Sequence, residues 1–340
     1  MKARLRSELF EFLVSQLLRC KRVLSSTRPV ARTLRAVERR EAFDDLYLHE
    51  QMLADAVRVN AYREAIERYV TSQHCVMDIG TGTGILAFLA AAKSPQKIYA
   101  VDHSKLMVDY ARAAADANDL NSVVFVASSG RKFRPQEQVD VIVQEQMGIA
   151  LFDEGMVETI IDLRDRCLKP GGRILPARFE FHLEPVQLCP SERVPMIQEQ
   201  RIHGLKFPRP STAPRDGYCF REITAEQIEF LLCDPEPVFS FDLATVTRDH
   251  LPKRFCVKKP IVRRGQLDGI CMYFRAIFDN DISFSTGPDA VKTHWPMLLY
   301  RTQVNAYQPG EVFTTVVEVP DLSDHIEWTW RIGAQSSRDA

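Results

Sequence analysis

The sequence lacks closely spaced cysteines and long apolar runs. Its eight cysteines never come closer than 14 residues to one another, so it holds no CxxC pair and no zinc knuckle. No apolar run approaches the roughly 20 residues that a membrane-spanning helix needs. We therefore expect no redox, zinc or membrane-spanning motif, and we expect reduced thiols within apolar stretches, as in a cytoplasmic protein.

The chain also has little net charge, but that charge is unevenly distributed. The formal net charge is −1 over 340 residues. Residues 1–40 carry 11 Lys or Arg and 3 Asp or Glu, so the other 300 residues carry 33 Lys or Arg against 42 Asp or Glu. An acidic body suits a cationic substrate, and it argues against direct nucleic-acid binding by the core.

Residues 1–40 are predicted to form a basic, helical N-terminal extension. Apolar residues lie at helical spacing at Leu9, Phe10, Leu13, Leu17 and Leu18, followed by Arg19, Lys21 and Arg22. Such a helix binds a membrane surface or a partner, or packs its apolar stripe on the body or on a second subunit. We favour packing. The segment lacks the features of a secretory signal.

Residues 41–176 are predicted to form a Rossmann-like domain. A helical pattern runs from His49 to Val70, and then strands alternate with helices. The predicted strands are 76–79, 97–102, 123–126 and 139–144, and the predicted helices include 85–92 and 155–168. The last helix ends at a turn, 169–172. This alternation is typical of a parallel, doubly wound sheet.

Residues 177–340 are predicted to form an antiparallel β domain, a barrel or sandwich. Apolar residues alternate with period two in 179–183, 239–243 and 326–332, and Pro309-Gly310 reads as a turn between two strands. The polar, proline-containing segment 189–217 interrupts this pattern and is predicted to be an inserted arm.

The loop after the first predicted strand has the composition of a nucleotide-cofactor site. It holds Asp78, Gly80, Gly82 and Gly84. Glycines allow a sharp turn and close approach of a ligand to the backbone. The dinucleotide fingerprint GxGxxG requires glycine at position 85, where this chain has Ile85, and this favours S-adenosylmethionine over a dinucleotide. Asp102, which ends the second strand, suits a ribose diol in either cofactor class.

Two glutamates bracket the loop after the fourth strand. Glu145 and Glu154 lie nine residues apart, and in an open α/β sheet this loop faces the ligand. If the loop folds back as a hairpin, both carboxylates meet one substrate. A pair of carboxylates suits the planar donor fork of a guanidinium. The alternative is that the two residues face solvent or cap the next helix.

The sequence resembles the protein arginine methyltransferase family over most of residues 49–340. The double-glutamate loop of that family is similar to 144–154, and its cofactor loop is similar to 76–84. Its helix motif is similar to 48–62, and its Thr-His-Trp motif to 293–295. The implied fold is a Rossmann-like S-adenosylmethionine-binding domain followed by an antiparallel β-barrel with an inserted dimerisation arm.

The resemblance also implies site residues and an assembly. Arg58 would hold the cofactor carboxylate and Asp102 the ribose, while Glu145 and Glu154 would clamp the substrate guanidinium. His294 would face Asp55, or would otherwise be a structural histidine. The residues implied to line the acceptor pocket are Met52 and Trp295. The arm would join two subunits in a homodimer.

The sequence departs from the family pattern near the acceptor pocket. Both tyrosines of the YFxxY element before His49 are absent in an ungapped match, and Gln146 and Ile149 stand where aromatic residues are frequent. The segment 128–133 lacks the glutamate that reads the adenine. The acceptor is therefore an arginine in a protein, or free arginine or another small guanidine. A silent partner of a related enzyme is a third possibility, which the retention of both glutamates disfavours.

Overall fold

The computed structural model describes residues 28–208 and 219–333. The chain divides into two compact units, residues 1–50 and 51–340. The first unit contains α2 (Arg28–Ala42) and the start of α3 (Leu46–Ala54), and the His49 ring bonds the Phe43 carbonyl oxygen at 2.9 Å. The apolar stripe predicted at residues 9–18 lies outside the described residues. Within the described ranges, no helix combines the length and apolar character needed to cross a membrane.

The single helix predicted from His49 to Val70 is wrong, because the structure has two helices that meet at Asp55. Helix α3 ends at Ala54 and α4 spans Ala56–Tyr69. Asp55 is the N-cap of α4, and its Oδ1 accepts the Arg58 backbone N–H at 3.0 Å. Aspartate is favoured at this position because it satisfies a donor that the first helical turn leaves unpaired.

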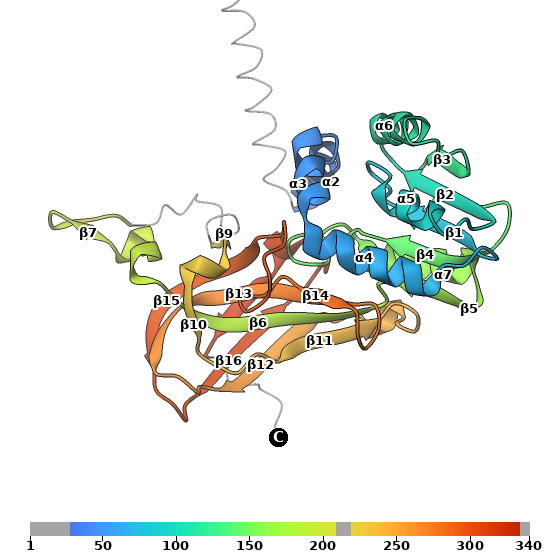
Figure 1. Cartoon of the computed structure of the whole chain (residues 1–340). Helices are drawn as coiled ribbons and strands as arrows, with labels where there is room; N and C mark the ends of the chain where they lie inside the picture. Colours follow the sequence, from blue (N-terminus) through green and yellow to red (C-terminus); the bar gives the residue numbers. More distant parts are fainter. Residues whose placement is uncertain (1–27, 209–218, 334–340) are drawn as a thin grey trace, which may run out of the picture. The chain divides into compact units, whose positions relative to one another are not determined.

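The parallel sheet contains five strands in the order β3-β2-β1-β4-β5 (Figure 1). Its strands are β1 (Cys75–Ile79), β2 (Lys97–Asp102), β3 (Val123–Ala127), β4 (Val139–Gln144) and β5 (Leu168–Leu175). The helices between them are α5 (Ile85–Ala91), α6 (Lys105–Asp116) and α7 (Met156–Cys167). The predicted Rossmann-like alternation is therefore confirmed, and the strand order reverses between β1 and β4.

Strand β5 was not expected, because its first residues read as a turn. The segment 168–175 begins Leu-Lys-Pro-Gly-Gly, and Gly171 has a φ of +77°. A Cβ added to Gly172 would lie 2.9 Å from the Asp140 carbonyl oxygen, so glycine there permits close approach of β5 to β4. The register shifts between Val139 and Val141 at the same place. The glycines thus mark an irregular strand start.

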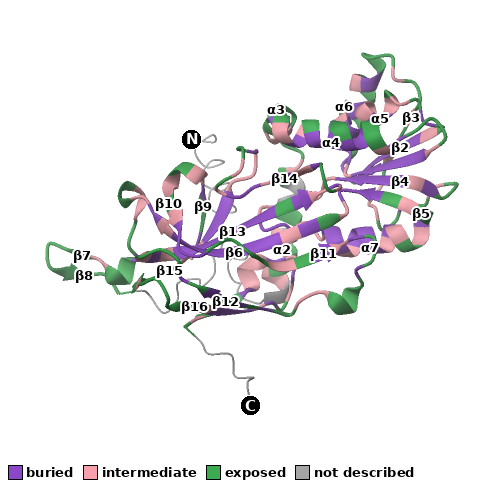
Figure 2. Cartoon of the chain, turned by 60° about the horizontal axis from the view of Figure 1, so that its bottom comes forward, coloured by how far each residue is buried: buried purple, intermediate pink, exposed green. Residues whose placement is uncertain are grey.

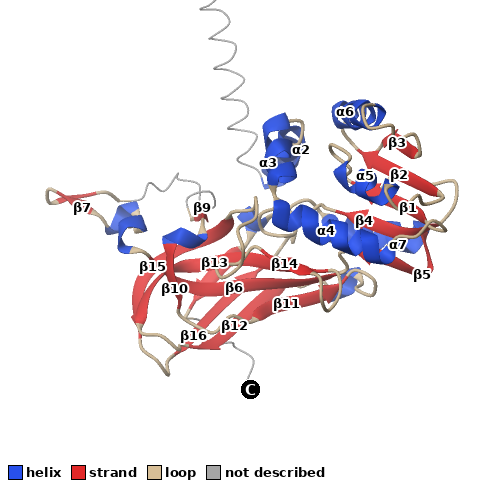
Figure 3. Cartoon of the chain, viewed as in Figure 1, coloured by secondary structure: helices blue, strands red, loops and turns tan. Residues whose placement is uncertain are grey.

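The second half is an antiparallel β half-barrel, which confirms the predicted class (Figure 3). Its larger sheet contains β6 (Arg178–Leu188), β9 (Phe220–Ile223), β10 (Ile228–Leu231), β11 (Pro237–Asp242), β13 (Gly265–Ile277), β14 (Ser283–Ser285) and β15 (Met297–Tyr307). Its smaller sheet contains β12 (Arg254–Pro260), β16 (Val312–Glu318) and β17 (Thr329–Ile332). The predicted turn at Pro309-Gly310 joins β15 to β16.

The strand predicted over 326–332 is only partly correct. Residues His325–Glu327 form a short 3-10 helix, η5, and β17 begins at Thr329. The Trp328 ring is buried, and its indole N–H donates to the Asp321 carbonyl oxygen at 2.8 Å. The apolar alternation therefore continues through a helical turn before the strand starts.

The described part of the predicted arm contains small elements of its own. These are η1 (Pro190–Glu192), η2 (Ile197–Glu199), β7 (Arg201–Ile202) and β8 (Leu205–Lys206). Strands β7 and β8 pair only with each other among the described strands, and the hairpin stands apart from the half-barrel in Figures 1 and 2. The boundaries of the arm and of the domains stay predictions.

One apolar core runs through the parallel sheet and the half-barrel (Figure 2). It includes strand residues of both, such as Ile142 and Phe274, which are fully buried. Cysteines 75, 167, 233 and 271 are buried, and no disulfide joins the seven cysteines within the described residues. Shared burial of this kind keeps the loops of the parallel sheet in a fixed position relative to the barrel.

Candidate functional site

Two loops of the candidate site begin side by side at the point where the strand order reverses. Ile79, the last residue of β1, pairs with Gln144, the last residue of β4. The glycine loop follows Ile79, and the loop that starts with Glu145 follows Gln144. In open α/β sheets ligands bind beyond the carboxyl ends of the strands at such a reversal. The sheet therefore brings the two predicted motifs together.

The glycine loop has the backbone that its sequence requires. Gly80, Gly82 and Gly84 all have positive φ, of +76°, +50° and +91°. A Cβ added to Gly84 would lie 2.5 Å from the Phe88 ring, and one added to Gly80 would lie 3.3 Å from the Gln146 side chain. These positions therefore exclude larger residues, and the loop leaves its backbone accessible to a ligand.

Asp78 fixes the glycine loop from within the sheet. It is fully buried, and its Oδ2 accepts hydrogen bonds from the Thr81 hydroxyl at 2.6 Å and from the Ala87 backbone N–H at 3.0 Å. Burial raises the pKa of this carboxyl to about 7, although both hydrogen bonds oppose the rise. Asp78 thus ties the loop to α5, and it is a positioning residue of the predicted cofactor site.

Asp102 ends β2 beside the glycine loop. Its Oδ2 accepts the Gly82 N–H at 2.9 Å and its Oδ1 accepts the Ser104 N–H at 2.8 Å. Burial alone would raise its pKa, but hydrogen bonds from His103, Ser104 and Gly82 bring the pKa below the ordinary value. His103 Nδ1 also lies 3.2 Å from Oδ1, so the acceptor capacity that Asp102 retains for a ribose diol is on Oδ2, which has a second lone pair.

Arg58 and Glu145 form a buried ion pair at the start of the second loop. Arg58 Nη1 lies 3.0 Å from Glu145 Oε2, and the two side chains are 3% and 6% exposed. Arg58 Nη2 donates to the Met52 carbonyl oxygen at 2.7 Å. Glu145 therefore does not face solvent, which excludes the alternative that this carboxylate is a solvated surface group.

The residues around Arg58 fit a carboxylate-bearing cofactor. Arg58 Nε is buried and has no hydrogen-bond partner among the residues that the structure describes. A buried guanidinium N–H without an acceptor is costly, and a carboxylate is its natural partner. Together with the glycine loop and Asp102, this donor suits the amino-acid, adenosyl and ribose parts of S-adenosylmethionine.

His294 and Asp55 meet across the sequence as predicted. Asp55 Oδ2 accepts the backbone N–H of His294 and lies 2.8 Å from its Nδ1, while Oδ1 caps α4. Burial would raise the Asp55 pKa, but the bonds from His294 and Arg58 bring it below the ordinary value. The pair fixes the start of α4, the helix that carries Arg58.

The loop between Glu145 and Glu154 folds back on itself. Gly148 and Leu151 form an antiparallel bridge, and the Leu151 N–H donates to the Gly148 carbonyl oxygen at 2.8 Å. Glu154 is half-buried and precedes Gly155, which is the N-cap of α7. Glu154 is therefore not the helix cap, and the two glutamates stand at the two ends of a hairpin-like loop.

The half-barrel holds the middle of this loop. Phe152 is 2% exposed and packs edge-on against Phe181 with ring centroids 5.2 Å apart. The Trp295 indole N–H donates to the Met147 carbonyl oxygen at 2.8 Å. Trp295, predicted to line the acceptor pocket, thus has a definite role in holding the loop. Met52 is half-buried, and its contribution to a pocket stays a prediction.

Three further residues, which the motifs do not predict as site residues, contact the loops. The Tyr62 hydroxyl donates to the Gln144 carbonyl oxygen at 2.6 Å, next to Glu145. Asp153 Oδ1 lies 2.6 Å from His325 Nδ1. Tyr62 lies in the helix motif and could have been singled out there. The Asp153–His325 pair joins residues 172 positions apart, and no sequence motif predicts it.

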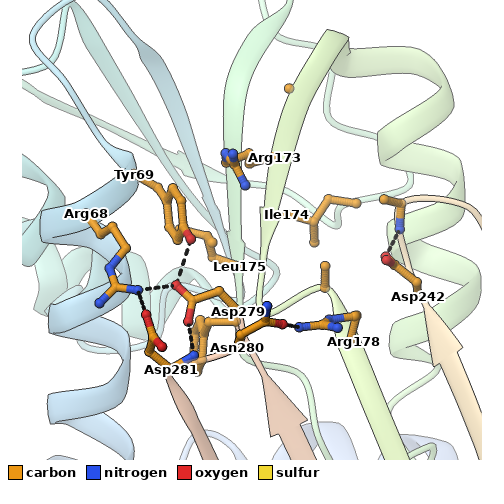
Figure 4. Close-up of a pocket in the computed structure, with 14 residues that line it drawn as sticks. Arg68, Tyr69, Arg173, Ile174, Leu175, Arg178, Asp242, Asp279, Asn280 and Asp281 are labelled. Carbon is orange, nitrogen blue, oxygen red and sulfur yellow. Dashed lines mark hydrogen bonds and ion pairs between the residues drawn. The ribbon is translucent and has the colours of Figure 1, made fainter.

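A cavity of about 560 Å³ lies elsewhere, between the end of α4, β5 and the turn after β13 (Figure 4). The Arg68 guanidinium pairs with Asp279 and Asp281, each at 2.8 Å, and the Tyr69 hydroxyl donates to Asp279 at 2.6 Å. Arg173 lies over the Tyr69 ring, 4.3 Å from its centroid. None of the predicted site residues lines this cavity, and its carboxylates have partners of their own.

Comparisons with known proteins agree with this geometry. A methyltransferase-domain model matches residues 76–172, and a model of the arginine methyltransferase oligomerization subdomain matches residues 217–328. Protein arginine N-methyltransferase 6 of Xenopus tropicalis is 32% identical over 309 residues, which cover 85% of this chain and 88% of that protein. The chain belongs to the protein arginine N-methyltransferase family.

Other members of the protein arginine N-methyltransferase family are similarly related. Protein arginine N-methyltransferase 1 of Dictyostelium discoideum is 28% identical over 293 residues, covering 82% of this chain and 83% of that protein. The solved Trypanosoma brucei PRMT1 enzyme–prozyme heterotetrameric complex with AdoHcy has a chain with the same fold, with a TM-score of 0.72 and 21% identity. That match covers 87% of this chain and 96% of the other. The methyltransferase-domain match decides between the two cofactor classes that the glycine loop left open.

Proposed function

We propose that this protein transfers a methyl group from S-adenosylmethionine to a guanidinium nitrogen of arginine, in a protein substrate. The observation that carries the proposal is the hairpin-like loop with a glutamate at each end, which starts beside the cofactor loop. Both glutamates of the family motif are present, and this favours an active enzyme over a silent partner.

The chemistry requires orientation more than proton removal. A guanidinium has a pKa above about 12, so it is a poor nucleophile. Glu145 and Glu154 would hold its N–H groups by charge-assisted hydrogen bonds and draw its positive charge toward the held nitrogens. Lone-pair density then remains on the free nitrogen, which the clamp aims at the cofactor. S-adenosylmethionine, when bound, supplies the methyl from its sulfonium; the thioether S-adenosylhomocysteine is the leaving group, and the methylated nitrogen releases one proton.

The cofactor would be held by residues of the parallel-sheet half. Arg58 would bind its carboxylate, Asp102 its ribose hydroxyls, and the glycine loop would lie against its adenosyl part. Met52 would line the acceptor pocket, and His294 would act through Asp55 as a positioning residue. Support comes from Arg58 Nε, which lacks a partner within 28–208 and 219–333, and from the acceptor capacity of Asp102.

A methyl-transfer assay tests the proposal against its alternatives. The purified protein would be incubated with isotope-labelled S-adenosylmethionine and either arginine-rich peptides, free arginine or no acceptor, with products identified by mass spectrometry. Label in peptide arginine supports the proposal, and label only in free arginine would favour a small-guanidine enzyme. Binding of cofactor without any labelled product would favour a silent partner. The same assay applied to Glu145→Gln should show less label, because that variant loses one clamp carboxylate. Glu64→Gln, an exposed change on α4, is its matched control.

We further propose a homodimer joined through the arm, in a cytoplasmic protein. The described arm exposes apolar side chains that a partner would cover, with Val194 69% and Leu205 64% exposed. The match to an oligomerization subdomain supports assembly, and the lack of disulfides among the seven described cysteines is consistent with a reducing compartment. Light scattering of wild type and of a Val194→Asp/Leu205→Asp variant tests the dimer, and equal masses would contradict it.

A further inference from the structure

The loop that carries the two glutamates contains a strained residue. Leu151 is fully buried and has a φ of +65°, in the left-handed region that non-glycine residues rarely adopt. This conformation is unfavourable for a residue with a side chain, and it persists only where the surrounding structure fixes it. The shape of the loop, and hence the position of Glu154, therefore depends on its contacts with the half-barrel.

Asp153 makes one of these contacts, directly before Glu154. The Asp153 carboxyl is 5% exposed and lies 2.6 Å from Nδ1 of His325 in η5. Its other oxygen accepts the Ala150 N–H at 2.8 Å, which closes the turn that contains Leu151. One buried side chain thus links the strained turn to the last helical turn of the barrel.

His325 is itself held in place. Its side chain is 12% exposed, and its ring packs edge-on against Phe220, with centroids 5.1 Å apart at 80°. The η5 turn leads through Trp328, which is 4% exposed and packs at 6.0 Å against Phe181 in the core. A ring fixed in this way can impose a position on Asp153 rather than follow it.

We propose that His325 and Asp153 are positioning residues for Glu154, the second of the two carboxylates that would hold the substrate guanidinium. The inference rests on the proposed function. Glu145 is held independently by Arg58, and the cofactor loop is held by Asp78 and Asp102. Loss of the His325 contact therefore affects the acceptor side of the site and leaves the cofactor side unchanged.

The test uses three variants of the full chain. His325→Leu removes the hydrogen bond, His325→Asn retains a donor near the position of Nδ1, and His250→Leu is the control. His250 also lies in a three-residue 3-10 helix of the barrel half, η4 (Arg248–His250), and its ring bonds the nearby Thr247 hydroxyl at 3.0 Å.

The kinetic result expected is a selective loss. His325→Leu should lower kcat/KM for an arginine peptide by about 10–100-fold, because small displacements of a positioning group have effects of this size. The affinity for S-adenosylhomocysteine should stay within about twofold, His325→Asn should recover most of the activity, and His250→Leu should resemble wild type. A parallel loss of cofactor affinity without rescue by asparagine would overturn the proposal, as would an unchanged kcat/KM.

Amide hydrogen exchange separates this inference from the proposed function. In His325→Leu, peptides covering 148–155 should exchange faster than in wild type and His325→Asn, while peptides covering 79–85 stay unchanged. Unchanged exchange in 148–155 would overturn the positioning role of His325 and Asp153, whether or not the wild type is active. If the wild type methylates no acceptor, but peptides covering 148–155 still exchange faster in His325→Leu, the proposed function alone would be overturned.

Discussion

Arg58 donates to Glu145 across 3.0 Å, so that one of the predicted clamp carboxylates binds a guanidinium of its own chain. The two side chains come from α4 and from the loop after β4, 87 residues apart. Both are more than nine-tenths buried. Removing one partner of such a pair leaves the other charge uncompensated, which is strongly destabilising.

Glu145→Gln is therefore expected to change both activity and cofactor response. Turnover should fall by about 100-fold or more, because a charged contact to the reacting group is lost. The ligand-free variant should melt at a lower temperature than wild type. Since the carboxylate of S-adenosylhomocysteine would replace the missing partner of Arg58, this ligand should raise the melting temperature of the variant more than that of wild type.

Scanning calorimetry with and without S-adenosylhomocysteine measures this difference, with Glu64→Gln as the control. An equal or smaller ligand-induced shift in Glu145→Gln would show that Arg58 does not receive the cofactor carboxylate.

Asp102→Asn is expected to weaken cofactor binding. The carboxylate would accept charge-assisted bonds from the ribose, each contributing about 1.5–3 kcal/mol, and asparagine replaces one acceptor by a donor. We expect a dissociation constant for S-adenosylhomocysteine that is about 10–100-fold higher, measured by calorimetric titration. Asp109→Asn on the exposed side of α6 is the control. If affinity is unchanged in Asp102→Asn, the ribose contact lies elsewhere.

Asp55 should stabilise the fold in a pH-dependent way. Its pKa in the folded protein lies below the ordinary 3.8, so its contribution is present above pH 3.8 and is lost as the pH falls through the folded-state value. Asp55→Ala removes the cap of α4 and the bonds to His294, and should lower the free energy of unfolding at pH 7 by about 2–4 kcal/mol. Urea unfolding at pH 7 and below pH 4 should show a smaller difference at the acidic pH. A constant difference would contradict the depressed pKa.

Asp78 should act in the opposite direction. Its folded-state pKa, about 7, lies above the value of 3.8 for the unfolded chain. The folded protein retains this proton while the unfolded chain releases it, so the stability contributed falls as the pH rises from about 4 to 7 and then levels off. The free energy of unfolding of Asp78→Asn relative to wild type should therefore increase over that range. Urea titrations at pH 5 and pH 8 measure it, and a flat difference would mean that Asp78 is ionised throughout.

The sequence predicted the parallel-sheet half well, because its strands and helices are local patterns with clear ends. Strand β5 was missed because its Pro-Gly-Gly start has turn chemistry, although those glycines serve a close approach to β4. The break at Asp55 was missed because an apolar helical pattern continues through it. The second oxygen of Asp55 contacts His294, which lies far along the chain, so local sequence does not reveal this contact.

The site was predicted as a set of motifs, and the contacts between motifs were not. The Asp55–His294 contact followed from the family resemblance, whereas the Arg58–Glu145 and Asp153–His325 pairs did not. These pairs depend on tertiary packing between elements 87 and 172 residues apart. Neither periodicity nor spacing carries information on which long-range partners meet.

The contact between Asp55 and His294 also bears on how the protein is made. The two residues are 239 positions apart, so a ribosome completes the whole parallel sheet and most of the barrel before His294 is available. Until then the first turn of α4 lacks the contact of Asp55 with His294. This turn carries Arg58, which would bind the carboxylate of the methyl donor. Nascent chains and C-terminally truncated fragments that stop before residue 294 should therefore capture the donor poorly.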